Sequence, residues 1–217
     1  MLGYAGYPDW RDMSEYLVHL TDEFAMNAIL RQRAIKAMKA FGAATNVAGL
    51  GDSQQAACLS EIPLDRLDRL VERHGEWGLG FLKSYIRCRN GGPVWYTHRD
   101  SDLAEAVFQT VRQAMCGGVD PEDPLWKLTP FIDKTGAWDG GRYEFEWERE
   151  WRVLGDLEFF VGDVEFLIIP EVQQASMQAW WDRNFGEMMP PVIDITWEMG
   201  RLQAALIDYK LSEDEAA

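Results

Sequence analysis

The sequence predicts an α+β fold in a single domain over residues 1–217, with a mixed or antiparallel sheet at its core and helices on its flanks. Length and composition are the first observation, because a chain of 217 residues with 47% hydrophobic and 26% charged residues can bury a core without disulfides or metals. Strand-like runs in the middle of the chain and helical patterns around them are the second. The absence of an internal repeat or a linker is the third, and it favours one domain.

Extended and helical patterns alternate in the first half of the chain. The strands predicted there are 16–20, 57–63, 78–81 and 93–96. Thr21 has a side chain that suits a helix N-cap, and the helix after it is predicted to end near Gln32. Apolar residues with a period of 3.6 predict a second helix after Pro63, and residues 101–115 predict a third. Gly75, Gly78 and Gly80 indicate a turn that enters a strand, because no P-loop Lys-Ser/Thr follows them.

The second half begins with an irregular connection and continues with a segment in which aromatic and charged residues alternate. Prolines and glycines predict that residues 120–139 form a long loop. From Tyr143 to Val153 the pattern predicts one strand with an aromatic face and an acidic face. The acidic face consists of Glu144, Glu146, Glu148, Glu150 and Arg152. Residues 165–169 and 191–195 predict strands, and residues 171–183 and 197–209 predict helices.

Charge and cysteine usage exclude several classes of protein. With 21 basic and 36 acidic residues the net charge is −15, which argues against a broad phosphate-binding surface. The three cysteines are widely spaced, so we expect a reducing cytoplasm and no disulfide framework. We find neither a signal peptide nor a membrane span in the sequence. The three histidines and three cysteines lack the short spacings of zinc sites, so we expect no metal.

Two residues are candidates for chemistry on their own. A row of like charges on one strand face is normally solvated, but Glu150, followed by Trp151 and Arg152, could instead point into a cleft and act on a substrate. His19 lies at the end of a predicted strand, where it is either a ligand contact or a structural residue. The residues alone leave both alternatives open.

Five segments, spread over residues 18–153, match the pattern of a known family. They are 18–21, 57–64, 77–83, 92–96 and 145–153. The most specific are Ser-Glu-Ile-Pro at 60–63 and Glu-Arg-Glu-Trp-Arg at 148–152. On these residues the sequence resembles the AbiGi-type abortive phage-resistance proteins, commonly described as the antitoxin side of a two-gene pair. The C-terminal third has no motif that we recognise.

This family is in turn similar to the DarT-type ADP-ribosyltransferases, which implies an ADP-ribosyltransferase-like fold and NAD as cofactor. The resemblance implies that His19 and Thr21 contact NAD and that Glu150 is the catalytic glutamate. Such a carboxylate stabilises the oxocarbenium-like state in which the nicotinamide–ribose bond breaks. Leu82 replaces a serine of the family pattern, and Ser60 and Tyr85 are both candidates for the middle residue of the triad.

Two functions therefore follow from the resemblance. One is an NAD-dependent ADP-ribosyltransferase-like enzyme of phage defence with a nucleic-acid or protein acceptor. The other is a catalytically inactive antitoxin or regulatory protein that binds a partner toxin. The basic segment formed by Arg31, Arg33, Lys36 and Lys39 is either a phosphate contact or a solvated helix face. If it contacts phosphate, Arg31 and Arg33 bind the NAD pyrophosphate or a nucleic acid.

Overall fold

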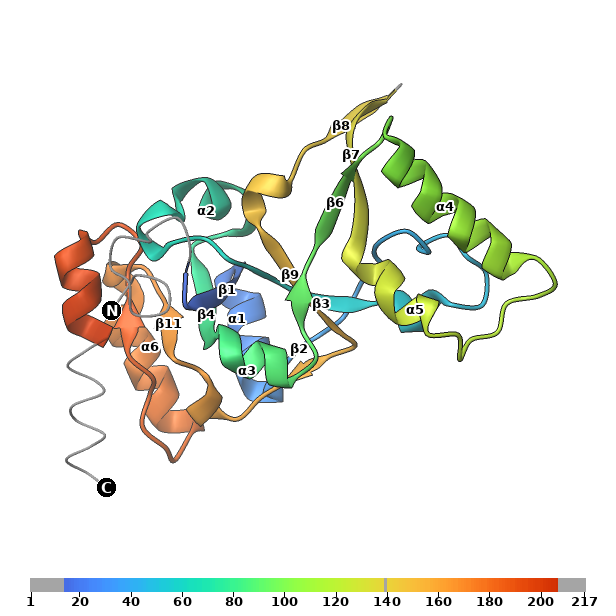
Figure 1. Cartoon of the computed structure of the whole chain (residues 1–217). Helices are drawn as coiled ribbons and strands as arrows, with labels where there is room; N and C mark the ends of the chain where they lie inside the picture. The colour runs from blue at the N-terminus through green and yellow to red at the C-terminus, as the bar shows by residue number, and fades with distance from the viewer. Residues whose placement is uncertain (1–13, 139, 207–217) are drawn as a thin grey trace. The chain divides into compact units, whose positions relative to one another are not determined.

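The chain folds into two units, each assembled from segments that are far apart in the sequence (Figure 1). The computed structural model describes residues 14–138 and 140–206. Within these residues, unit 1 takes 14–33, 60–85 and 159–206, and unit 2 takes 34–59 and 86–158. Helices accompany a mixed sheet, which confirms the predicted α+β class. A single domain over 1–217 stays a prediction.

The sheet of unit 1 has the strand order β12-β11-β4-β1. These strands are β1 (Tyr16–Thr21), β4 (Trp77–Leu82), β11 (Phe166–Ile168) and β12 (Val192–Ile193). β4 is antiparallel to both β1 and β11, whereas β11 and β12 are parallel. Gly80 lies opposite Val18 on one side and Phe166 on the other, and a Cβ on Gly80 would come within 2.1 Å of the Phe166 ring. A side chain at position 80 would therefore displace the ring at the centre of this sheet.

The helices of unit 1 begin where its strands end. They are α1 (Glu23–Gln32), α2 (Asp68–His74), α6 (Glu171–Asn184) and a helix over 199–206, and the short α3 (Lys83–Cys88) begins here and continues into unit 2. The predicted helices at 171–183 and after Thr21 are confirmed, but the N-cap of α1 is Asp22, whose carboxylate accepts a hydrogen bond of 2.8 Å from the Ala25 N–H. Asp22 takes this position because Thr21 is still part of β1. Residues 207–209 of the predicted last helix lie outside the described residues.

Unit 2 contains three groups of strands and one long helix. The strand orders are β3-β9-β5, β6-β7-β8 and β10-β2. Their bounds are β2 (Ala34–Ile35), β3 (Ala56–Ser60), β5 (Gly92–Pro93), β6 (Trp95–His98), β7 (Ile132–Trp138), β8 (Gly141–Tyr143), β9 (Glu150–Leu154) and β10 (Leu157–Glu158). The last residue of β3, Ser60, belongs to unit 1 and pairs with Val18 of β1. The helices are α4 (Asp102–Met115), which confirms the helix predicted at 101–115, and the short α5 (Leu125–Leu128).

Two sequence predictions in unit 2 are wrong. Residues 120–139 are not a loop throughout, because they include α5 and most of β7. Residues 143–153 are not one strand, because β8 ends at Tyr143, a 3-10 helix covers Glu146–Glu148, and Arg149 takes a left-handed conformation with φ 47°. The acidic face of four glutamates therefore does not exist. Only Glu150 and Arg152 share a strand face, that of β9.

Among the described residues, no helix is long and apolar enough to cross a membrane.

Candidate functional site

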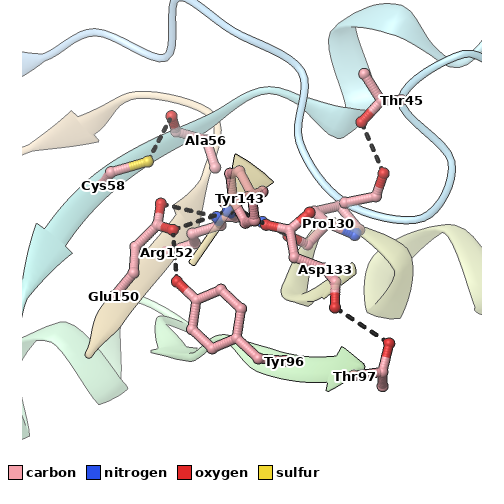
Figure 2. A network of polar contacts seen from close by, with 11 residues as sticks. Thr45, Ala56, Cys58, Tyr96, Thr97, Pro130, Asp133, Tyr143, Glu150 and Arg152 are labelled. Atoms are coloured by element: carbon pink, nitrogen blue, oxygen red, sulfur yellow. Dashed lines mark hydrogen bonds and ion pairs between the residues drawn. The ribbon is translucent and has the colours of Figure 1, made fainter. Parts of the chain in front are cut away.

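Glu150 lies at the start of β9 and forms a two-point contact with Arg152. The Glu150 backbone carbonyl accepts a hydrogen bond of 2.8 Å from the Val94 N–H, so the position of the strand is fixed next to β5. Arg152 lies two residues later on the same face. Its Nε donates to Glu150 Oε1 at 3.0 Å and its Nη2 donates to Oε2 at 2.8 Å (Figure 2). This is the paired geometry in which guanidinium and carboxylate bind most strongly.

The Arg152 guanidinium is the centre of the site, and its side chain is 0% exposed. Besides Glu150 it donates hydrogen bonds to the Asp133 carboxylate on β7 and to the Pro130 carbonyl, and it lies 4.3 Å from the centroid of the Phe41 ring. Burial by itself lowers the pKa of this guanidinium. The hydrogen bonds and charges of Glu150 and Asp133 outweigh burial and leave the pKa raised. Two carboxylates and one cation give the site a net charge of −1.

Two tyrosines complete the hydrogen bonding of these carboxylates. Tyr96 on β6 donates to Glu150 Oε2 at 3.2 Å, and Tyr143 at the end of β8 donates to Asp133 Oδ2 at 3.4 Å. Burial raises the pKa of both phenols. The charge of Glu150 raises both pKa values further, and the charge of Asp133 raises the pKa of Tyr143. Both tyrosines therefore remain protonated donors at neutral pH.

Cys58 on β3 lies beside this cluster (Figure 2). Burial raises the pKa of its thiol, and the charge of Glu150 raises it further. Because the thiolate is the reactive form of cysteine, Cys58 is a weak nucleophile in this environment.

The chemistry open to Glu150 is limited by its partners. Both of its oxygens accept hydrogen bonds from Arg152, and Oε2 also accepts one from Tyr96. A substrate hydroxyl that approached Glu150 would have to compete with these donors. The contacts favour a role for Glu150 in holding β9 and β6 together, while Arg152 connects β9 to Asp133 on β7.

The NAD contacts expected from the resemblance belong to unit 1. His19 and Thr21 are partly buried residues of β1, opposite Leu79 and Trp77 of β4. Glu150 belongs to unit 2. Among the residues of the predicted triad, His19 and Glu150 thus come from different units, and their roles stay predictions.

The predicted basic segment does not form one helix face. Arg31 lies in the last turn of α1, with its guanidinium 5.4 Å from the centroid of the Trp180 ring. Arg33 ends the helix in a left-handed conformation with φ 51° and forms an ion pair of 2.6 Å with Glu187. Lys36 follows β2 in unit 2 and pairs with Asp156 at 2.7 Å. A binding role for Arg31 and Arg33 stays a prediction.

Ser60 and Tyr85, the two candidates for the middle residue of the triad, both lie in unit 1. Ser60 is 8% exposed, and the Tyr85 ring stacks on Phe81 with centroids 5.9 Å apart. Close to them in the sequence, Glu61 and Lys83 form a buried ion pair of 2.8 Å, with side chains 8% and 3% exposed. Two of the family segments named above therefore meet through a charged contact inside unit 1.

Sequence reasoning missed most of the partners of the Glu150–Arg152 pair. The sequence predicts a loop at Asp133, and Tyr96 is one of several aromatic residues in a short predicted strand. The spacing of Glu150 and Arg152 on one strand face indicates that these two side chains contact each other. It does not indicate that Tyr96 and Asp133 join them. Among the described residues, no group of three or more His, Cys, Asp or Glu is placed to hold a metal ion.

Comparison of the sequence with protein families tests the resemblance described above. Residues 27–183, more than two thirds of the chain, match the family described as "Putative abortive phage resistance protein AbiGi, antitoxin". The chain belongs to the AbiGi family. The match includes Arg152 and its partners, starts after His19 and Thr21, and extends beyond the segments recognised in the sequence into the C-terminal third. Neither the curated proteins nor the solved structures compared with this AbiGi chain gave a match.

Proposed function

We propose that this AbiGi-family protein is the antitoxin of an abortive-infection pair and that it acts by binding a partner toxin. The observation that carries the proposal is the match to the AbiGi antitoxin family over residues 27–183. The engagement of Glu150 by Arg152 and Tyr96 supports it, because a carboxylate held in this way serves the scaffold. The net charge of −15 suits a basic partner, since complementary charge accelerates encounter and suppresses wrong partners.

The test is to find a toxin gene next to the gene of this protein and to measure rescue of growth in cells that express that toxin. Co-expression of the wild-type protein should restore growth, and the purified pair should bind with an association rate that falls as salt is added. Glu150→Gln, once circular dichroism shows that it is folded, should rescue as well as the wild type, because Asp133 still pairs with Arg152 and binding does not need a catalytic carboxylate. Failure of the wild-type protein to rescue, with no complex formed, would contradict the proposal.

The second candidate function is NAD-dependent ADP-ribosyl transfer to a nucleic-acid or protein acceptor, with Glu150 as the catalytic carboxylate. Its support is the place of Glu150 on β9, within reach of the Tyr96 hydroxyl at 3.2 Å. This function requires NAD to bind. At 100 times its dissociation constant NAD would stabilise the protein by about 2.7 kcal/mol, which raises the unfolding midpoint by about 5–11 °C.

Turnover separates the two functions. The enzyme function predicts that NAD is consumed and that Glu150→Gln abolishes this consumption while the protein stays folded. The antitoxin function predicts that neither the wild type nor Glu150→Gln consumes NAD, and that both relieve toxicity.

A further inference from the structure

Positive charge gathers on unit 2 at a place that the sequence does not reveal. Lys134 on β7, Arg99 just after β6, and Arg112 on α4 come from three parts of the chain. α4 lies beside β6 and β7 in Figure 1, and α4 contacts β6. The charges of Arg99 and Arg112 both act on the Lys134 ammonium.

The geometry of this basic cluster (Arg99, Arg112 and Lys134) is set by backbone pairing. Thr97 of β6 and Lys134 of β7 are partners in a parallel ladder, and the Arg99 N–H donates to the Thr135 carbonyl at 2.9 Å. The Lys134 Nζ lies 3.4 Å from the centroid of the Phe108 ring on α4. Strand pairing and this ring contact therefore hold Lys134 against α4.

The charge of Glu105 acts on the Lys134 ammonium, and Arg112 already engages this carboxylate. Oε1 of Glu105 accepts a hydrogen bond of 2.6 Å from Arg112 and one of 3.1 Å from Gln109. Arg112, Lys134 and Glu105 together carry a charge of +1. Burial lowers the pKa of Lys134, and the charges of Arg99 and Arg112 lower it further against the pull of Glu105. The local field thus favours the arrival of an anion.

An exposed aromatic ring lies on the same sheet face. Trp95 is 50% exposed and lies two residues before Thr97 on β6, so its side chain points to the face that carries Lys134. The spacing of residues and strands places the backbones of Trp95 and Lys134 about 8 Å apart. A nucleotide base stacks on an exposed indole, while Arg and Lys bind its phosphate.

We infer that Arg99, Arg112 and Lys134 bind the phosphate group of a nucleotide whose base stacks on Trp95. Arg112 is suited to the first encounter because its side chain is 58% exposed. The nucleotide is either free or part of a single strand, since both carry a base next to a phosphate. This site belongs to unit 2 and is separate from the residues expected to contact NAD, so it does not depend on either proposed function.

Isothermal titration calorimetry with AMP, adenosine, inorganic phosphate and a single-stranded thymidine dodecamer tests the inference. AMP should bind more tightly than inorganic phosphate and adenosine, because each of these lacks one of the two contacts. Lys134→Gln and Arg112→Gln should each weaken AMP binding by about tenfold or more, and Trp95→Ala should do the same. Lys127→Gln, which removes an exposed cation of α5 in the same unit, should leave the affinity unchanged.

The source of the nucleotide follows from the same series. Tighter binding of the dodecamer than of AMP, weakened by the same substitutions, assigns the site to a single strand, and the reverse order assigns it to a free nucleotide. The inference is overturned if AMP does not bind at millimolar concentration, if adenosine binds as tightly as AMP, or if Arg112→Gln and Lys134→Gln both bind AMP like the wild type. NAD also carries phosphates. Loss of NAD binding in Lys134→Gln but not in Arg31→Ala would show that NAD binds at the basic cluster as well.

Discussion

Removal of the Arg152 side chain should be among the most damaging single changes in unit 2. Arg152→Ala leaves Glu150 and Asp133, whose side chains are 11% and 17% exposed, without their cation. Removal of one partner from a buried ion pair costs about 3–5 kcal/mol of unfolding free energy. For a chain of this size that loss lowers the unfolding midpoint by about 6–20 °C, which differential scanning calorimetry at pH 7 measures directly.

A triple variant separates charge from packing. Arg152→Ala combined with Glu150→Gln and Asp133→Asn removes the cation together with the two carboxylates that it neutralises, so it should recover at least half of the lost stability. Arg152→Met, which keeps an apolar stem, should still be destabilised because both carboxylates remain. The reasoning is refuted if Arg152→Ala lowers the midpoint by less than about 2 °C, or if the triple variant is less stable than Arg152→Ala.

Three further predictions concern other parts of the structure. Gly80→Ala should lower the unfolding free energy by about 1–3 kcal/mol in urea titrations, because a Cβ there overlaps the Phe166 ring; an unchanged midpoint would show that the ring moves freely. Asp22→Ala should cost about 1 kcal/mol by loss of the α1 cap, whereas Asp22→Asn should restore most of it in the same titration. The phenol of Tyr96 has a raised pKa, so its contribution to stability is complete below about pH 10 and is lost as pH rises further. Tyr96→Phe should therefore flatten the alkaline fall in stability measured between pH 9 and 12, and an equal slope in both proteins would contradict this.

Much of the fold was predictable from the sequence, because several helices and strands have residue types and flanking residues that match their structure. The helix at 101–115 has an apolar stripe of helical period, and the strand before Thr21 is a short run of mostly buried residues. The structure places α4, α6 and β1 within one residue of the predicted bounds. Periodicity alone cannot show where a strand is interrupted. Arg149 breaks the regular alternation with a left-handed backbone, which is rare for a residue with a Cβ, so the sequence favoured a single long strand.

The candidate site was predictable only in part, and the reason is its long-range contacts. Glu150 and Arg152 are two residues apart, so alternation on a strand brings them together. Asp133 and Tyr96 reach the same cluster from β7 and β6, and only the pairing of these strands reveals it. The basic cluster around Lys134 is hidden for the same reason, because a run of cations in the sequence is visible and a convergence of three separate ones is not.

Interruption of unit 1 by the segments of unit 2 has a consequence for synthesis of the chain on the ribosome. All of unit 2 emerges before β11 and β12. Until Phe166–Ile168 is made, β4 has hydrogen-bonding groups along one edge with no strand beside them. An open edge of this kind pairs with other chains. A chain that stops after Glu158 should therefore aggregate through β4. Unit 1 is completed only when the C-terminal segment with β11 and β12 has been made.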